Sequence, residues 1–240
     1  MKRLIFFAGA FLLLVGVLSL WAAVRHQNIL ETPHDTVTIP EGWTVSDINS
    51  YLQERGVLVG EELSGDLEGY LFPDTYEFFL DSTVVVVQQR FQDNFRAQLK
   101  KMGIEVAEDH LREIIIVASL IEKEIQNVQE KRIVSGILWK RLENEVPLQV
   151  DATICYIKDA ESCLPITASD KGIDSEYNTY LYEGLPPGPV CNPGAGSILA
   201  AARPAESPYW YYLSSDGDGG TVFAKTLDEH RQNIIKYLNE

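Results

Sequence analysis

The strongest hydrophobic pattern in the interior of the chain runs from Leu111 to Ile125, where apolar residues fill almost every position. The run is too short to cross a bilayer and contains Ser119 and Glu122, so it predicts the central, buried helix of a soluble core. Glu122 follows small or apolar residues at helical spacings of three, four, seven and eight, which puts its carboxyl on an otherwise apolar stripe. Poor solvation favours the protonated carboxyl, which is the form that a general acid needs near neutral pH.

The same acid has a simpler interpretation, because most carboxylates near a helix end do no chemistry. Glu122 would then end the buried part of the helix and point toward water, where Lys123 or Lys131 could pair with it. Glu124 lies on a neighbouring apolar stripe of the same helix, so the pattern does not exclude it as the chemically active acid.

A second apolar run, from Leu4 to Val24, is long enough to cross the hydrocarbon core of a membrane as one helix. Lys2 and Arg3 precede it, so the positive-inside rule keeps the N-terminus in the cytoplasm. A cleaved signal peptide is the alternative, but the run exceeds the usual length of a signal core. We therefore expect residues 1–26 to be a cytoplasmic tip and single-pass anchor in the cytoplasmic (inner) membrane, with the remainder on the outer, periplasmic side.

Between these two runs the pattern predicts small elements. Residues 36–40 alternate like a short strand, and a helix follows that ends at Gly56. Residues 68–78 are rich in aromatic rings and carboxylates, which can line a sugar groove or simply bury the rings in a core. A long amphipathic helix is expected over residues 84–102.

After the central helix, the pattern predicts a further amphipathic helix over residues 129–144 and a short helix capped by Asp151 or Thr153. Residues 184–196 are rich in proline and glycine, which is typical of a rigid loop that lines a cleft. The C-terminal part predicts a helix through Ala202, two paired strands at 209–213 and 220–224, and a last helix capped by Thr226.

Composition narrows the choice of partners. A formal net charge of -15 argues against nucleic acid and against attachment to anionic lipid, because both need concentrated basic residues. The three cysteines do not form a zinc pattern, although Cys155 and Cys163 are close enough to staple a short loop in an oxidising compartment. No phosphate-binding, dinucleotide or zinc-hydrolase motif is present, so we expect no cofactor and no metal.

Four motifs, taken together and in order, resemble the MltG-type (YceG-like) endolytic murein transglycosylases. The resemblance covers roughly residues 67–237, and the polar tail from Asp216 to His230 also fits it. The motifs are Glu68-Gly-Tyr-Leu-Phe-Pro-Asp-Thr-Tyr76, Ala118-Ser-Leu-Ile-Glu-Lys-Glu124, Leu148-Gln-Val-Asp-Ala-Thr-Ile-Cys-Tyr156, and Tyr177-Asn-Thr-Tyr180 through Gly184-Leu-Pro-Pro-Gly-Pro189 to Asn192-Pro-Gly194.

The resemblance implies an α+β fold with an N-terminal transmembrane helix, a reduced LysM-like subdomain, and a mainly helical catalytic domain with a small antiparallel sheet. Residues 27–66 would hold the linker and the truncated LysM-like subdomain, and residues 67–240 the catalytic domain. The stretch between Val59 and Leu67, where the family carries more of the LysM-like part, is nearly absent.

The activity implied by the resemblance is that of a carbon–oxygen lyase. The family cleaves nascent peptidoglycan strands between N-acetylmuramic acid and N-acetylglucosamine and leaves a 1,6-anhydro end. Glu122 matches the catalytic acid and would act first as general acid and then as base. The resemblance also implies an association with peptidoglycan synthases. The residues expected to bind substrate or assist are Glu68, Tyr70, Gln149, Asp151, Tyr156, Asn178 and Asn192.

Two alternatives stay open at this point. The chain could be a catalytically reduced, membrane-anchored glycan-binding or scaffold protein of the cell-wall synthesis machinery. It could also be an ordinary muramidase that uses Glu122 with Asp151 and releases reducing ends instead of anhydro ends.

Overall fold

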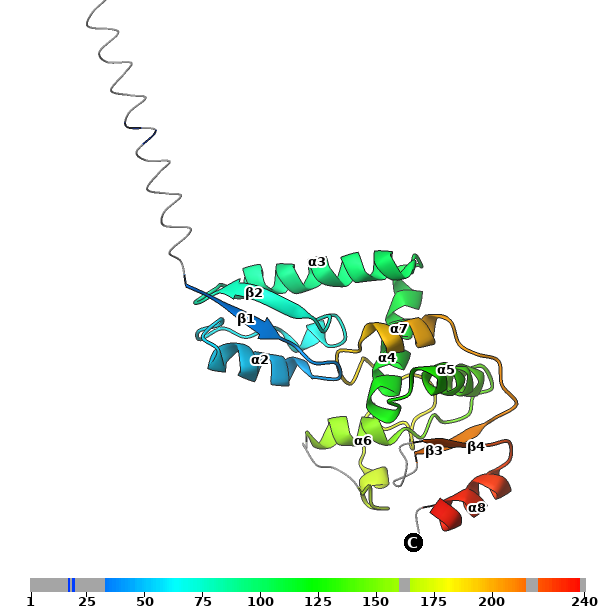
Figure 1. The fold of residues 1–240 in the computed structure, drawn as a ribbon. Helices are drawn as coiled ribbons and strands as arrows, with labels where there is room; N and C mark the ends of the chain where they lie inside the picture. The colour runs from blue at the N-terminus through cyan, green and yellow to red at the C-terminus, as the bar shows by residue number, and fades with distance from the viewer. Residues whose placement is uncertain (1–16, 18, 20–32, 160–164, 215–219, 238–240) are drawn as a thin grey trace, which may run out of the picture.

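The structure is a computed structural model, and it describes residues 17, 19, 33–159, 165–214 and 220–237. Figure 1 shows one region built from two strands and two helices, followed by a larger region that surrounds a central helix. Helices predominate and the strands form two small antiparallel pairs, so the predicted α+β class is confirmed.

The first region contains a two-stranded ribbon and a capped helix. Strand β1 (His34–Thr38) pairs antiparallel with β2 (Thr75–Phe79). Helix α2 (Val45–Glu54) begins in a capping box, where the Thr44 hydroxyl accepts from the Asp47 amide and the Asp47 carboxylate accepts from the Thr44 amide. The strand and the helix predicted in this part of the chain are therefore both present.

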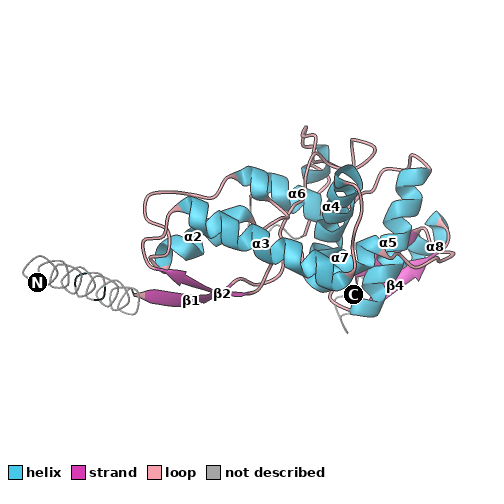
Figure 2. Cartoon of the chain, turned by 90° about the horizontal axis from the view of Figure 1, so that it is seen from above, coloured by secondary structure: helices cyan, strands magenta, loops and turns pink. Residues whose placement is uncertain are grey.

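Helix α3 (Val84–Met102) completes the first region and extends beyond it. Its buried residues Val87 and Phe91 pack with Tyr76 of β2 and with α2 in one hydrophobic cluster. Figures 1 and 2 show that α3 then runs on toward the second region. The hydrophobic cluster of this first region extends past the domain boundary predicted after residue 66. It includes β2 and the first half of α3.

The second region is organised around α4 (Glu108–Glu124), in which every residue of the segment 114–121 is buried. Helices α5 (Val128–Glu143) and α7 (Ala195–Ala202) pack against it. The predicted central helix is therefore confirmed, and its burial explains why the segment carries so few polar residues.

The smaller elements of the second region lie at one end of it (Figure 1). They are α6 (Asp151–Lys158), the short 3₁₀ helix η2 (Asp170–Gly172), β3 (Tyr211–Ser214), β4 (Thr221–Ala224) and α8 (Leu227–Tyr237). Strands β3 and β4 pair antiparallel, as the sequence predicts, and α8 packs against them.

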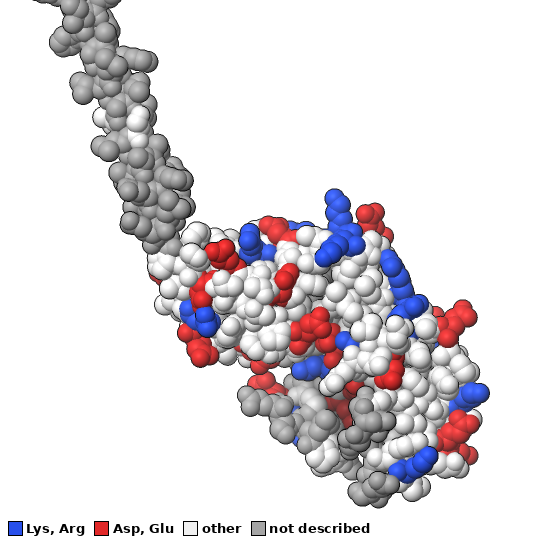
Figure 3. Space-filling view, in the orientation of Figure 1, with Lys and Arg blue, Asp and Glu red and all other residues white. Residues whose placement is uncertain are grey.

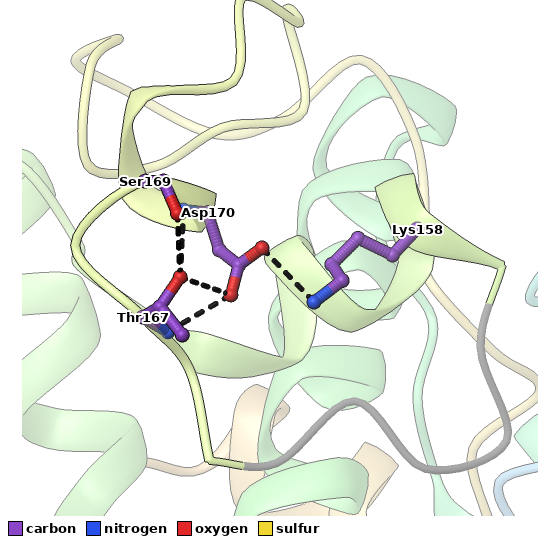
Figure 4. A network of polar contacts seen from close by, with 4 residues as sticks. All are labelled: Lys158, Thr167, Ser169 and Asp170. Atoms are coloured by element: carbon purple, nitrogen blue, oxygen red, sulfur yellow. Dashed lines mark hydrogen bonds and ion pairs between the residues drawn. The ribbon is translucent and has the colours of Figure 1, made fainter.

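Polar contacts tie the segment around η2 to helix α6 (Figure 4). The Asp170 carboxylate accepts from the Thr167 amide at 2.9 Å and hydroxyl at 2.7 Å, and it pairs with Lys158 Nζ at 2.9 Å. The Thr167 hydrogen bonds, helped by Lys158, lower the pKa of Asp170 to about 2. Cys155 of α6 is disulfide-bonded, and its expected partner Cys163 lies outside the described residues.

Two backbone hydrogen bonds join the two regions directly. The Gly42 amide donates to the Asn192 carbonyl at 2.9 Å, and the Asn192 amide donates to the Trp43 carbonyl at 2.8 Å. The Lys123 ammonium at the end of α4 also donates to the Gly42 carbonyl at 3.0 Å. The turn before α2 is therefore anchored on the loop that leads into α7.

The described part of the chain holds no helix that is long and apolar enough to cross a membrane. The expected anchor, residues 4–24, lies outside the described residues except at positions 17 and 19.

Candidate active site

The last turn of α4 carries two acids on different sides of the helix. Glu122 and Glu124 are two positions apart, which corresponds to a rotation of about 200° around the helix axis. Glu122 faces α5 and the start of α7, whereas Glu124 faces the start of α6. The two carboxyls therefore meet different neighbours and differ in chemistry.

Both carboxylate oxygens of Glu122 have partners inside the protein. Oε1 pairs with Lys131 Nζ at 3.0 Å, and Oε2 accepts from the Gly194 amide at 3.0 Å. The side chains of this ion pair are only 9% (Glu122) and 6% (Lys131) exposed. The pairing with Lys131 agrees with the simpler interpretation, but the carboxylate does not point toward water as that interpretation expects. The pair and the Gly194 hydrogen bond join α4, α5 and the start of α7.

A second carboxylate, from Glu41, lies beside this ion pair. A Cβ on Gly194 would approach Glu41 Oε1 to 1.8 Å, so any larger residue at this position would force the Glu41 side chain to move. Burial, and then the negative charge of Glu122, raises the pKa of Glu41. The Glu122 side of α4 is thus a closely packed junction between the two regions.

Glu124 has a different environment. Its Oε1 accepts from the Ala152 amide at 3.1 Å, near the start of α6. Burial raises the pKa of Glu124 to about 7, the Ala152 hydrogen bond opposes this rise, and the negative charge of Asp151 adds to it. Among the described residues, no cation lies within ion-pair distance of this carboxyl. Such an acid is in part protonated at neutral pH and can both give and accept a proton.

Polar groups from other motifs surround Glu124. Tyr180 donates its phenolic hydrogen to Asp151 Oδ1. Burial raises the pKa of both Tyr180 and Tyr212, and the nearby charges of Asp151 and Glu124 add to that rise. We call these four residues, Glu124, Asp151, Tyr180 and Tyr212, the Glu124 cluster.

Arg141 of α5 holds the surroundings of this cluster in place, although the sequence analysis did not single it out. This buried guanidinium donates to the Trp210 carbonyl at 2.9 Å and to the Leu148 carbonyl at 2.9 Å. Its position in the sequence could have indicated burial, because it follows the buried Ile137 and Leu138 at helical spacing. An arginine on the buried stripe of a helix calls for acceptors, and here it joins β3 to the segment before α6.

Gln149 lies directly before the Glu124 cluster. Its backbone is in the left-handed region, with φ of 55°, and its amide donates to the Thr179 carbonyl at 3.0 Å. The next amide, that of Val150, donates to the Thr179 hydroxyl at 3.0 Å. The exposed Gln149 side chain is therefore presented at the start of α6, as a substrate-contacting residue requires.

Asn178 supports the Glu124 cluster through a hydrogen bond to the backbone of Tyr180. It is fully buried, donates to the Ile173 carbonyl at 2.8 Å and to the Lys171 carbonyl at 3.1 Å, and accepts from the Tyr180 amide at 3.0 Å. Asn178 therefore shapes the turn that carries Tyr180, and its side chain is not open to a ligand.

Glu68 and Asn192 meet at the junction between the two regions. The Glu68 carboxylate accepts from the Val45 amide at 3.1 Å and from Asn192 Nδ2 at 3.0 Å, and Asn192 Oδ1 accepts from the Leu71 amide at 2.9 Å. Burial raises the pKa of Glu68 to about 7, while the Val45 amide opposes the rise. Both residues have hydrogen-bond partners within the protein, and their contact with substrate stays a prediction.

The tyrosines expected at the site lie apart from the Glu124 cluster. Tyr156 packs against Tyr177 with ring centroids 4.9 Å apart, and burial, followed by the charge of Glu68, raises the pKa of Tyr156. Tyr70 packs edge-on against Phe95 at 5.5 Å. Of the expected residues, Asp151 acts directly on Glu124, and Asn178 supports the turn that carries Tyr180, which is bonded to Asp151.

No group of three or more potential metal ligands occurs among the described residues. The negative charge of Asp151 acts on Glu124, and that of Glu122 acts on Glu41. The pairing of Glu122 with Asp151 in a two-acid muramidase stays a prediction of that alternative.

The fold and the site describe an α+β protein with a partly protonated acid at the end of a buried helix, surrounded by tyrosines and a second carboxylate. The model of the YceG-like family matches residues 9–236, so the chain belongs to the YceG-like family.

Proteins of known name and structure agree with this assignment. The Bacillus subtilis (strain 168) protein named endolytic murein transglycosylase is 34% identical over 181 residues, covering 72% of this chain and 48% of that protein. A protein of the same name from Streptococcus pneumoniae serotype 2 is 28% identical over 185 residues, covering 72% of this chain and 32% of its own. The chain thus spans half or less of these relatives. The crystal structure of a YceG-like protein from Listeria monocytogenes superposes with a TM-score of 0.67 at 29% identity, covering 82% of this chain and 75% of that one.

Proposed function

We propose that the protein is an endolytic lytic transglycosylase that cleaves peptidoglycan glycan strands between N-acetylmuramic acid and N-acetylglucosamine and leaves 1,6-anhydro ends. The family membership and the names of the relatives support the reaction class. The observation that carries the proposal is the environment of Glu124, a half-buried acid with a pKa of about 7 at the meeting point of three family motifs.

We assign the proton transfer to Glu124, although the resemblance alone points to Glu122. The two oxygens of Glu122 are already occupied by partners within the protein, namely Lys131 and the Gly194 amide. A general acid has to start protonated, and Glu124 meets this requirement near neutral pH. Glu122 is then a positioning residue that fixes the last turn of α4.

The reaction needs a single carboxyl. Protonated Glu124 gives its proton to the glycosidic oxygen as the bond from that oxygen to the muramic C1 breaks. The C6 hydroxyl of the same sugar attacks C1, and its proton passes to the Glu124 carboxylate, which regenerates the acid. Attack within one sugar replaces water as nucleophile and gains from the high effective concentration of the hydroxyl.

The other members of the Glu124 cluster have supporting roles in this proposal. The charge of Asp151 keeps the proton on Glu124 and stabilises positive charge that develops at C1. Tyr180 holds Asp151 in place through its hydrogen bond, and Arg141 fixes the backbone on both sides. Gln149 is exposed beside them and would contact the glycan.

We also propose that residues 4–24 anchor the protein in the cytoplasmic membrane with its catalytic region outside. The apolar run and the preceding Lys2 and Arg3 support this orientation. A position beside nascent strands also supports an association with peptidoglycan synthases.

The test compares Glu124→Gln with Glu122→Gln, assayed by mass spectrometry for anhydromuropeptides released from polymeric glycan strands. Glu124→Gln should lower the rate by about 10² to 10⁴ because it cannot donate a proton. Glu122→Gln leaves Lys131 buried without its partner and should cost about 3–5 kcal/mol of stability. An inactive but fully folded Glu122→Gln, beside an active Glu124→Gln, would transfer the assignment to Glu122.

The double variant Glu122→Gln with Lys131→Gln is the matched control. It removes both charges of the pair and should regain most of the stability that Glu122→Gln loses. If Glu122 only positions the helix, the double variant regains activity along with stability. Strand binding by the native chain without any anhydro product would instead favour the glycan-binding or scaffold function, and reducing-end products would favour a muramidase.

A further inference from the structure

One corner of the first region exposes an unusual number of large apolar side chains. They come from the loop after α2, the end of β2, the residue that follows β2 and the start of α3, and we call them the apolar corner. They are Val59 (63% exposed), Phe79 (48%), Leu80 (37%), Val85 (71%) and Val86 (55%).

Hydrogen bonds hold these segments together at one place. The Leu80 amide donates to the Pro33 carbonyl at 2.9 Å, the Asp81 amide to the Gly56 carbonyl at 2.9 Å, and the Ser82 amide to the Val57 carbonyl at 2.8 Å. The backbone segments that carry the apolar corner are therefore held next to one another.

The valines at the start of α3 stabilise the fold very little. Residues 84–87 are all valine, a β-branched residue that is a weak helix former. Val87 is buried in the core, but Val85 and Val86 are mostly exposed and gain little from packing. Two exposed valines in the first turn of a helix indicate a surface that something apolar covers.

The position of the corner identifies what covers it. Phe79 pairs with His34, the first residue of β1, and Leu80 bonds to Pro33, so the corner lies where the chain enters the described structure. Only residues 25–32 separate this point from the apolar run that ends at Val24, a span of at most about 30 Å. The apolar corner thus lies within reach of the membrane that we propose holds residues 4–24.

The charge of the first region determines which kind of lipid surface can bind the apolar corner. From residue 33 to the end of α3 at Met102 the basic residues are Arg55, Arg90, Arg96, Lys100 and Lys101, and they are outnumbered by acids. On the face shown in Figure 3, the described basic and acidic side chains are interspersed, with no concentrated basic area. Attraction to anionic headgroups is therefore weak, and the contact has to come from apolar side chains.

We propose that the apolar corner rests in the interface of a zwitterionic bilayer, beside the anchor, and orients the protein on the membrane. This inference rests on the proposed anchor and is independent of the catalytic assignment. Side chains that bind in this way enter the boundary between headgroups and acyl chains by about 5–10 Å.

The experiment uses the full chain in phosphatidylcholine nanodiscs that contain lipids with a quencher in the acyl chain. A fluorophore is attached in turn to Phe79→Cys, Val85→Cys and the control Val128→Cys, a 59% exposed position at the start of α5. Treating the native chain with the same fluorophore measures the background labelling of its natural cysteines. Cys191, one of these, is buried. We expect most of the emission to be lost at positions 79 and 85 and little at 128.

Two further measurements sharpen the outcome. Adding Val86→Glu to the Val85→Cys chain should restore most of the emission, and replacing phosphatidylcholine by phosphatidylglycerol should weaken the quenching. Equal quenching at 85 and 128 in chains that elute with nanodiscs would overturn the inference and leave the anchor intact. Chains that fail to elute with nanodiscs would overturn both. If the emission at position 85 changes with protein concentration in lipid-free detergent, a second copy of the chain covers the apolar corner. That result would also overturn the membrane inference.

Discussion

Glu68 offers a quantitative test of the junction between the two regions, because it is an acid buried without a cation within ion-pair distance among the described residues. Its side chain accepts from the Val45 amide and from Asn192, and burial raises its pKa from the ordinary 4.5 to about 7. A rise of this size corresponds to about 3 kcal/mol between the two protonation states. Glu68→Gln replaces the carboxyl by a neutral group of the same shape and removes this titration.

The sign of the effect follows from which state ionises first. Below pH about 4.5 Glu68 is protonated in both states and contributes no pH dependence. As the pH rises from about 4.5 to about 7, the unfolded chain loses the proton while the folded chain keeps it, so folding stability falls. We therefore expect the native protein to lose about 3 kcal/mol more stability than Glu68→Gln over this window.

Urea unfolding of both chains at a series of pH values between about 4.5 and 8 measures this difference. Tryptophan fluorescence is a suitable signal, because the Trp43 carbonyl accepts from Asn192, next to Glu68, and its ring packs edge-on against Tyr51 at 5.3 Å. Glu62→Gln, an exposed change in the same region, is the control and should follow the native curve. Parallel curves for Glu68→Gln and the native chain would refute the reasoning.

Three other changes test the second region. Gly136→Ala places a Cβ 2.0 Å from the Ala205 carbonyl oxygen and should destabilise the fold by about 1–3 kcal/mol, measured as a lower unfolding temperature. Arg141→Lys keeps the charge but loses the forked hydrogen bonds, and should lower activity more than it lowers substrate binding. Asp151→Asn removes a charge that raises the pKa of Glu124, so the loss of activity with rising pH should shift to lower pH, whereas an unchanged profile would show that Asp151 does not act on Glu124.

Much of the fold follows from the hydrophobic pattern. The buried run in α4, the capping residue Thr44 and the glycine-rich stretch before β4 each predict an element that the structure contains. Strand β2 was missed, because its partner β1 lies about 40 residues earlier and the aromatic residues 75–79 fit a groove as well as a core. The buried rings of Tyr76 and Phe78 now assign them to the core.

The candidate site could be predicted only in part. The motif that contains Glu122 and Glu124 was found, but the sequence cannot show which acid meets Lys131, because that depends on how α4 and α5 pack. Asn178 and Asn192 were found because they belong to a family motif. Their contacts are with backbone groups of other segments, which the motif does not reveal. Arg141 was overlooked because a single cation on a helix usually faces water.

The paired backbone hydrogen bonds between Gly42, Trp43 and Asn192 bear on how the protein can be dissected. A version shortened to begin at residue 67 would leave the edge of β2 open to strand pairing with other chains, and it would deprive Glu68 of the Val45 amide. Loss of activity in such a truncated version would then report misfolding and aggregation, and would carry no information about whether the missing residues bind glycan.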